Sequence, residues 1–236
     1  CGPYDRRDCS KRRERDETLR FQLEALPLPV QFDREEWPHH PVVDDYRRYC
    51  CQEDLPDSVK RNAIRIYYGL CSFLDAQVGV VLKALKETGL DKNTRVLYCT
   101  DHGDTMGEHG LFFKSTMYEG SVSIPMIFSG PGIRKGKRNA TGVSLVDIYP
   151  TAIECLGGVM CGEDRRLPGR SLLAFAGGKE EPERAVYSEY LGFGIYTGEF
   201  MLRRGRFKYI HYVGERPQLF DLKEAPEECR DLAGDP

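Results

Sequence analysis

At 236 residues the chain is long enough to form one large domain with a sizeable core. Its hydrophobic content of 40%, charged content of 30% and formal net charge of −3 are typical of a soluble globular protein. They give no reason to expect nucleic acid or a membrane as partner. No apolar run approaches the roughly 20 residues that span a bilayer.

The nine cysteines are scattered and form no Cys-x-x-Cys pair, so a structural zinc site has no support. Cys71, Cys99 and Cys155 lie in apolar segments and are expected to be buried thiols. Three others could pair in an oxidising compartment, namely Cys50, Cys161 and Cys229. The redox compartment therefore stays open.

The N-terminal stretch Cys1–Arg20 mixes charges of both signs, which predicts a solvated helix or loop rather than a basic binding patch. The chain opens on Cys-Gly-Pro without a start methionine or a signal-like segment, which suggests a processed product or a fragment. Two prolines force extended backbone at 26–29. We interpret the proline-bracketed pair His39-His40 as part of a surface loop rather than a ligand pair.

A long helix is predicted from Asp57 to Thr88, because apolar residues recur at intervals of three and four. They are Tyr67, Leu70, Leu74, Val78, Val81 and Leu85. Gly89 ends the helix, and a buried strand follows at Arg95–Thr100. A helix followed directly by a strand is half of a βαβ unit, which predicts a parallel sheet.

That strand ends at Asp101-His102-Gly103. In open α/β sheets, ligands sit just outside the carboxyl ends of the strands. Asp101 offers hard oxygen ligands, His102 a nitrogen ligand or an acid, and Gly103 a tight backbone turn. Lys114 follows twelve positions after His102 and could return a positive charge to the same cleft.

A second buried strand is predicted at Ile124–Phe128. The basic turn at 134–138 is expected to be a solvated loop, and Asn139-Ala140-Thr141 forms a glycosylation sequon that matters only if the protein is secreted. Ser144 and Asp147 have the spacing of a capping box, before a helix that runs to Leu156.

From Ala185 onward, short alternating runs separated by glycine-containing turns predict a small antiparallel sheet, with a hairpin at Arg203–Arg206. We therefore divide the chain into 1–165, an α/β part, and 166–236, a small antiparallel β subdomain.

The ordered set of a strand, Asp101-His102-Gly103, Gly107-Glu108-His109-Gly110 and Lys114 resembles the sulfatase family of the alkaline-phosphatase-like superfamily. Supporting blocks lie upstream and downstream, at 73–79, 145–151, 169–172 and 218–222. The resemblance runs from about Leu26 to the end. It implies an α/β sandwich with a mostly parallel sheet, incomplete at the N-terminus, plus the antiparallel C-terminal sheet.

The resemblance also implies roles for single residues. Asp101 matches the family's metal-binding aspartate, and His102 matches the position beside the metal and the ester oxygen. Lys114 matches the lysine that contacts the sulfate. The metal would be a divalent cation, calcium in most sulfatases. His109 is either a structural turn histidine near the site, which we favour, or a substrate-binding residue. Asp104 and Glu108 are expected to fix the loop.

Other parts of the family's pattern are missing. Sulfatases use a formylglycine made in a Cys/Ser-x-Pro-x-Arg motif, and Cys1–Arg6 fails this motif because Asp5 stands where arginine is needed. We therefore expect this chain to be the C-terminal portion of a sulfatase, with half the active site and little turnover alone. Its partner would be the missing N-terminal half.

Three functions remain open. The first is hydrolysis of a sulfate monoester, which could be carried by a sugar. The second is hydrolysis of a phosphonate or phosphate monoester, since a metal, a lysine and a histidine serve that chemistry equally well. The third is a non-catalytic sulfatase-like domain that binds sulfated ligands. A periplasmic or secreted location is favoured over a cytoplasmic one.

Overall fold

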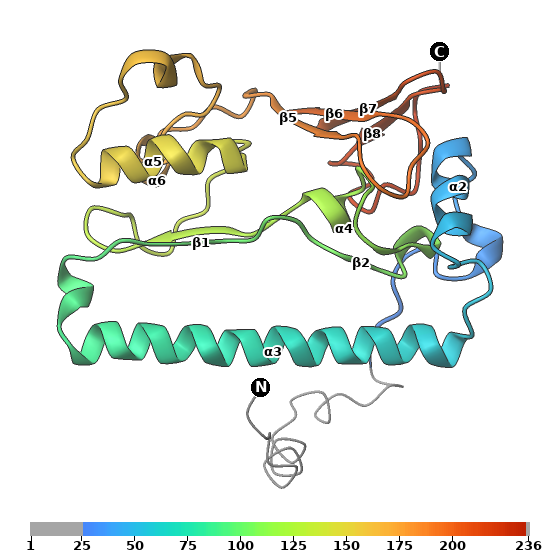
Figure 1. Cartoon of the computed structure of the whole chain (residues 1–236), viewed down its shortest axis with the longest axis horizontal. Coiled ribbons are helices and arrows are strands. Elements are labelled where there is room, and N and C mark those ends of the chain that lie inside the picture. Colours follow the sequence, from blue (N-terminus) through green and yellow to red (C-terminus); the bar gives the residue numbers. More distant parts are fainter. Residues whose placement is uncertain (1–25, 235–236) are drawn as a thin grey trace, which may run out of the picture.

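A computed structural model describes residues 26–234 of the chain. Figure 1 shows the long helix α3 on one side of a ribbon of two strands, β1 and β4, with α5 and α6 on the other side. The C-terminal sheet stands beside these helices. The solvated segment expected at Cys1–Arg20 lies outside the described residues.

The helix α2 (Pro41–Tyr49) was not predicted, and it corrects the interpretation of 37–41 as a surface loop. His39 is exposed, but Trp37 and His40 are buried. His40 is the N-cap of α2, because its Nδ1 accepts from the Val42 N–H at 3.3 Å. Proline at the first helical position fits this start. His40 therefore has a structural role as the cap of α2.

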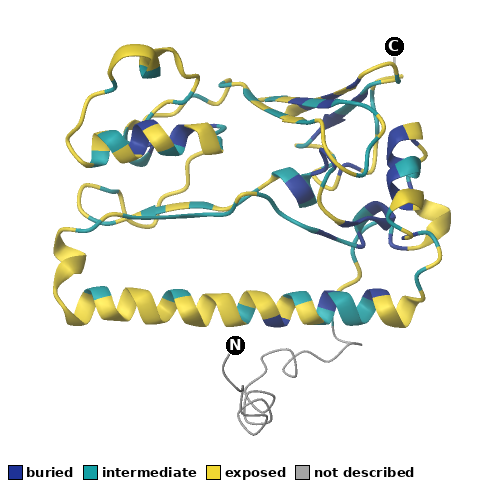
Figure 2. Cartoon of the chain, in the orientation of Figure 1, coloured by how far each residue is buried: buried dark blue, intermediate teal, exposed yellow. Residues whose placement is uncertain are grey.

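The predicted long helix is confirmed as α3 (Asp57–Glu87), which ends before Gly89 in the left-handed conformation (φ 73°) and the 3₁₀ turn η4 (Leu90–Lys92). Its apolar stripe is only partly covered, because Tyr67, Val78 and Leu85 are half-buried while the other three members are exposed. Leu70 is 58% exposed and Val81 60% exposed, and Figure 2 shows α3 exposed along most of its length. By length and composition alone, α3 could cross a membrane, a test that core helices of soluble proteins also pass.

Strand β1 (Val96–Cys99) pairs with β4 (Met126–Ser129), with Val96 opposite Ser129 and Cys99 opposite Met126. The pairing is antiparallel, and so is every other strand pair within residues 26–234. The prediction of a mostly parallel sheet is therefore not met there. The segment that connects β1 to β4 lacks the long crossover helix that two parallel neighbouring strands need, so these strands pair antiparallel. Both strands are also only partly buried or exposed, not fully buried.

The connection between β1 and β4 holds four short elements. They are β2 (Thr105–Met106), η5 (Glu108–Gly110), β3 (Phe112–Phe113) and α4 (Glu119–Val122). β2 and β3 form an antiparallel pair, so this segment folds back on itself beyond the end of β1.

The predicted C-terminal sheet is confirmed, as four antiparallel strands in the order β5-β6-β7-β8. Their bounds are Val186–Tyr190, Glu199–Arg204, Phe207–Tyr212 and Gln218–Asp221. Its hairpin turns through Gly205 (φ 56°) between paired Arg204 and Phe207. The main core of the molecule lies where one face of this sheet meets α2 and the 111–118 loop, and includes Val42, Val43, Tyr46, Leu111, Met117, Tyr118, Met201, Ile210, Tyr212 and Phe220.

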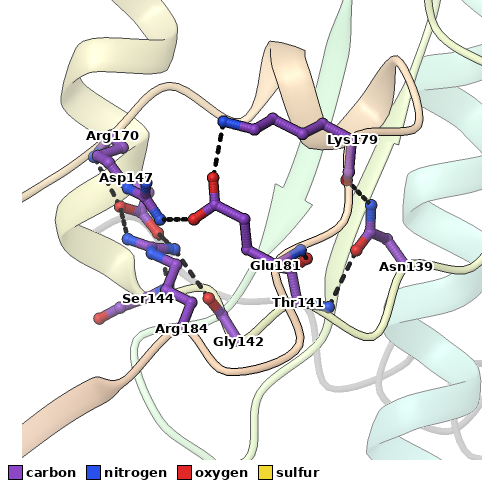
Figure 3. Close-up of polar contacts among 9 residues, drawn as sticks. All are labelled: Asn139, Thr141, Gly142, Ser144, Asp147, Arg170, Lys179, Glu181 and Arg184. Atoms are coloured by element: carbon purple, nitrogen blue, oxygen red, sulfur yellow. Dashed lines mark hydrogen bonds and ion pairs between the residues drawn. The ribbon is translucent and has the colours of Figure 1, made fainter. Parts of the chain in front are cut away.

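A buried ion pair ties the C-terminal sheet to the helical layer. The capping box of η6 (Leu145–Asp147), predicted from Ser144 and Asp147, is confirmed. The fully buried Asp147 carboxylate also accepts from Arg184, just before β5, at 2.8 and 2.7 Å (Figure 3). The division of the chain at residue 165 stays a prediction.

Between Asp147 and Arg184 the chain forms α5 (Ile148–Cys155), η7 (Gly162–Arg166) and α6 (Leu173–Ala176). Within residues 26–234 every cysteine is free. Cys71 is exposed on α3, which corrects the expectation of a buried thiol, while Cys99 and Cys155 are partly buried. Cys50, Cys161 and Cys229 do not pair with one another.

Candidate active site

The segment that leaves β1 is pressed against α4. The Gly103 N–H donates to the Ser121 carbonyl at 2.7 Å. A Cβ on Gly103 would lie 2.2 Å from the Gly120 carbonyl oxygen, far inside contact distance. Glycine is therefore required here by the close approach of two backbones, rather than by a tight turn. This approach fixes where the two residues before it are presented.

Asp101 and His102 interact directly. Asp101 Oδ1 accepts from the His102 N–H at 3.1 Å, and Oδ2 lies 3.4 Å from His102 Nε2. Backbone N–H groups of Asp101 and His102 lower the pKa of the Asp101 carboxyl, which is therefore an anion at neutral pH. The His102 Nδ1 lies 2.8 Å from the Gly103 carbonyl, which makes Nδ1 the donor. With its proton on Nδ1, the imidazole keeps a lone pair on Nε2 that can accept a hydrogen bond on the cavity side.

Lys114 closes the group, with its Nζ 2.7 Å from His102 Nε2. The residues on either side, Phe113 (φ 71°) and Ser115 (φ 75°), both have left-handed backbone. Such conformations are strained for residues other than glycine and cluster at functional sites.

Two tyrosines from distant segments hold the strained loop. The Tyr46 hydroxyl on α2 donates to the Lys114 carbonyl. Ser115 Oγ donates to the Tyr190 hydroxyl on β5 at 2.9 Å. Burial raises the pKa of Tyr46 well above its usual value, so this donor keeps its proton. The loop that carries Lys114 is thus clamped from both sides.

A cavity of about 340 Å³ opens beside these groups. Asp101, His102 and Lys114 all line it, and so do Tyr187 and Tyr190 of the C-terminal sheet. The structure therefore brings three of the sequence-predicted site residues into one cavity, between both parts of the chain.

The fourth predicted residue, His109, lies outside this cavity. It is 3% exposed, stacks on Tyr118 at 4.5 Å and places Nδ1 2.6 Å from Gln31 Oε1. The buried Arg47 donates twice to its carbonyl. Burial lowers the pKa of His109 to about 4, so the ring is neutral. This geometry supports a structural histidine and gives no support to substrate binding.

Glu108 behaves as a loop-fixing acid, because its Oε2 accepts from the Met106 N–H. Asp104 does not line the cavity. Sequence reasoning missed the two tyrosines, since Tyr46 and Tyr190 lie 68 and 75 residues from the positions they hold. No local pattern marks either one.

Asp101 and His102 have the right donor atoms for a divalent cation, but they are too few to complete its coordination shell. Asp101 supplies carboxylate oxygens on an 84% exposed side chain, and His102 supplies one nitrogen. Within residues 26–234, no cluster of three or more histidine, cysteine or acidic side chains could hold a metal. Because Ca²⁺ takes 6–8 oxygen ligands, further ligands would have to come from elsewhere.

Comparisons with known proteins cover both parts of the chain. A family model described as Sulfatase matches residues 27–159, and one described as N-sulphoglucosamine sulphohydrolase, C-terminal, matches residues 107–236. Arylsulfatase K of Gallus gallus is 37% identical over 228 residues. The match covers 91% of this chain and 41% of that relative, so the chain spans about two fifths of the relative's length.

Two solved structures share the fold. The phosphonate monoester hydrolase from Silicibacter pomeroyi has a TM-score of 0.79 and 27% identity, over 92% of this chain and 48% of that one. A 2-O GAG sulfatase has a TM-score of 0.73 and 30% identity, over 90% of this chain and 49% of that one. In both comparisons about half of the neighbour lies outside the match.

Proposed function

The chain belongs to the sulfatase family, and we propose that it supplies the metal-facing and sulfate-facing half of the active site of a sulfuric ester hydrolase. One observation carries the proposal. The Asp101 carboxylate, the His102 imidazole and the Lys114 ammonium line one cavity, with 2.7 Å between His102 Nε2 and Lys114 Nζ.

Each residue has a defined task in this proposal. The Lys114 ammonium binds a sulfate oxygen and offsets the negative charge that grows on the ester in the transition state. His102 Nε2 accepts from the Lys114 ammonium in the free protein. Once Lys114 turns to the sulfate, Nε2 can pass a proton to the leaving oxygen, while its Nδ1–H stays on the Gly103 carbonyl. His109 keeps a structural role, with no contact to substrate.

Asp101, with His102 beside it, is this chain's contribution to a divalent cation site, for which the family favours Ca²⁺. When bound, the cation would act as a Lewis acid toward the ester oxygens. The remaining ligands and the formylglycine nucleophile would come from a preceding N-terminal half. The incomplete donor set and the chain's two-fifths coverage of Arylsulfatase K support this division.

The exposed stripe of α3 supports the same division. Leu70, Leu74 and Val81 are between 47% and 60% exposed, a contiguous apolar face that a soluble protein normally covers. We propose that the N-terminal half covers this face and adds strands beside β1 in the parallel direction that the described strands lack. We also propose a periplasmic or secreted location, which membership of the sulfatase family supports.

The substrate is proposed to be a sulfate monoester on a sugar, by analogy with the 30% identical 2-O GAG sulfatase. A phosphonate or phosphate monoester is the second candidate, favoured by the TM-score of 0.79 to a phosphonate monoester hydrolase. A non-catalytic sulfatase-like domain is the third. Such a domain would not need a lysine clamped by two distant tyrosines, which argues against it.

Steady-state hydrolysis by the full-length gene product that contains this chain tests the proposal. We expect metal-dependent release of sulfate from a sulfated disaccharide, with a kcat/KM above that for a matched phosphonate monoester. The isolated 236-residue chain should show little or no turnover. Preferential phosphonate hydrolysis would establish the second candidate, and no hydrolysis of either ester would establish the third.

A further inference from the structure

A second cavity lies under the basic turn at 134–138. Its volume is about 640 Å³, and Arg134, Lys137 and Arg138 line it together with a single acid, Glu180. Among the described residues, none of these three cations forms an ion pair with a carboxylate. The lining therefore carries an excess of unpaired positive charge, although the whole chain has a net charge of −3.

The turn is anchored at both ends. Before it, Arg95 Nε donates to the Pro131 carbonyl at 2.9 Å. After it, the Asn139 amide nitrogen donates to the carbonyls of Phe175 and Lys179 at 2.9 and 2.7 Å. Figure 3 shows Asn139 held between Lys179 and Thr141, whose N–H donates to Asn139 Oδ1 at 2.9 Å.

This anchoring has two consequences. Residues 134–138 are all exposed, as expected of a solvated loop, but the anchors at both ends fix the rim that carries the cations. In addition, both hydrogens of the Asn139 amide are engaged with backbone carbonyls, so the sequon asparagine serves the architecture of the rim.

The floor of the cavity is apolar. Phe128 of β4 and the buried residues Leu172 and Phe175 form it. Cations around an apolar floor suit a ring that carries anionic groups, because the ring face packs on the floor while the charges meet the rim. A bare inorganic anion would leave the floor unused.

This cavity adjoins the catalytic one. Val143 lines both cavities, and it is the only described residue that does so. A ligand with several linked anionic rings would have to pass Val143 to reach both cavities. Binding a remote part of a substrate in this way adds affinity for the extended chain over a single ring.

We propose that the cavity beneath Arg134 and Arg138 is a second binding site, which holds a sulfated saccharide unit of the chain whose ester is cleaved at Lys114. The proposal rests on the proposed sulfatase function for its choice of ligand. A concave site with an apolar floor fits a saccharide better than the flat contact that a membrane surface would make. A single-stranded RNA is the competing polyanion, and it enters as an outcome of the test.

The test is titration calorimetry of a heparin hexasaccharide into the full-length protein, in a Lys114→Ala background that slows turnover. The double variant Arg134→Glu/Arg138→Glu should weaken binding by about tenfold or more at low salt. The matched control is Arg165→Glu/Arg166→Glu on η7, which changes the net charge equally outside the cavity. It should alter the affinity by less than about twofold. Arg134→Lys/Arg138→Lys, which keeps both positive charges, should retain most of the affinity for the hexasaccharide.

Equal weakening by both charge-reversed variants, or by neither, would overturn the proposal. So would binding of a poly(U) oligonucleotide as tight as that of the hexasaccharide and dependent on the same arginines. If the hexasaccharide binds through Arg134 and Arg138 while the unmutated protein hydrolyses no sulfate ester, the second site stands and the proposed function fails. Melting curves of each variant establish that it is folded.

Discussion

Lys114 Nζ lies 2.7 Å from His102 Nε2, across a loop whose two residues flanking the lysine are in left-handed backbone conformations. The contact joins the segment that leaves β1 to the segment clamped by Tyr46 and Tyr190. Strain of this kind persists only where the surroundings enforce it. The arrangement therefore presents an ammonium, an imidazole and the Asp101 carboxylate to one cavity.

Asp101→Asn should weaken the binding of Ca²⁺ to the full-length protein by about tenfold or more, because an amide oxygen replaces a full negative charge among the ligands. Calcium titration calorimetry measures this directly. Asp91→Asn on the exposed turn η4 is the control and should leave the affinity unchanged. Equal affinity of the Asp101 variant and the unmutated protein would remove Asp101 from the metal site.

Arg184→Met should destabilise the fold by about 3–5 kcal/mol, because it leaves the fully buried Asp147 carboxylate without its partner. The matched variant is Arg170→Met, since both guanidinium groups lie over the Phe175 ring. Its ion pair with Glu181 is far more exposed, so the loss should be about 0–1 kcal/mol. Urea denaturation measures both, and similar losses would contradict the account.

The same pair has a pH signature. Burial would raise the pKa of Asp147, but the Arg184 guanidinium and the N–H groups of Arg170 and Ser144 lower it overall. A lowered carboxyl pKa stabilises the fold above the unfolded value, near 3.8, and this contribution is lost as the pH falls below it. The stability difference between Arg184→Met and the unmutated protein should therefore shrink in acid.

Glu199→Gln should stabilise the protein at pH 8. Burial raises the pKa of Glu199 to about 8, and its Oε2 has no hydrogen-bond partner among the described residues. The folded protein holds this proton while the unfolded chain releases it near pH 4.5, so stability falls between pH 4.5 and 8. The melting temperature should rise by about 2 °C or more at pH 8, and not at pH 4. The exposed Glu224→Gln should show no such pH-dependent gain.

Gly103→Ala should destabilise the fold by about 1–3 kcal/mol, because the new Cβ meets the Gly120 carbonyl at 2.2 Å and the backbone must move. Gly79→Ala on α3 is the contrast, since nothing lies within 4 Å of its Cβ. It should stabilise the helix by about 0.5–1 kcal/mol. Thermal unfolding separates the two. Tolerance of alanine at 103 would mean that the segment after β1 is not fixed by α4.

Periodicity and local chemistry predicted several elements of the fold. The spacing of apolar residues predicted α3, and the alternation of apolar and polar residues predicted the C-terminal sheet. The spacing of Ser144 and Asp147 predicted the capping box of η6. Each of these signals acts within a few residues, where sequence pattern and structure are directly linked. Asp101, His102 and Lys114 were predicted from a motif at a strand end and from the family resemblance. The structure brings them into one cavity, and their roles stay predictions.

Features that depend on distant contacts were not predicted. The direction of β4 relative to β1 follows from the path of the connection, which composition does not encode. The helix α2 is short and follows a proline-bracketed segment, so its apolar spacing was too brief to recognise. Tyr46 and Tyr190 acquire their roles only when three segments meet around Lys114.

The most direct test of the account is the effect of Lys114→Ala on sulfate release from a sulfated disaccharide by the full-length protein. We expect kcat/KM to fall by about 10²- to 10³-fold, because the ammonium that offsets the sulfate charge is lost. Lys92→Ala on the exposed turn η4 should leave the rate unchanged. A folded Lys114→Ala protein that retains the unmutated kcat/KM would contradict the assignment of this cavity as the sulfate-facing half of the active site.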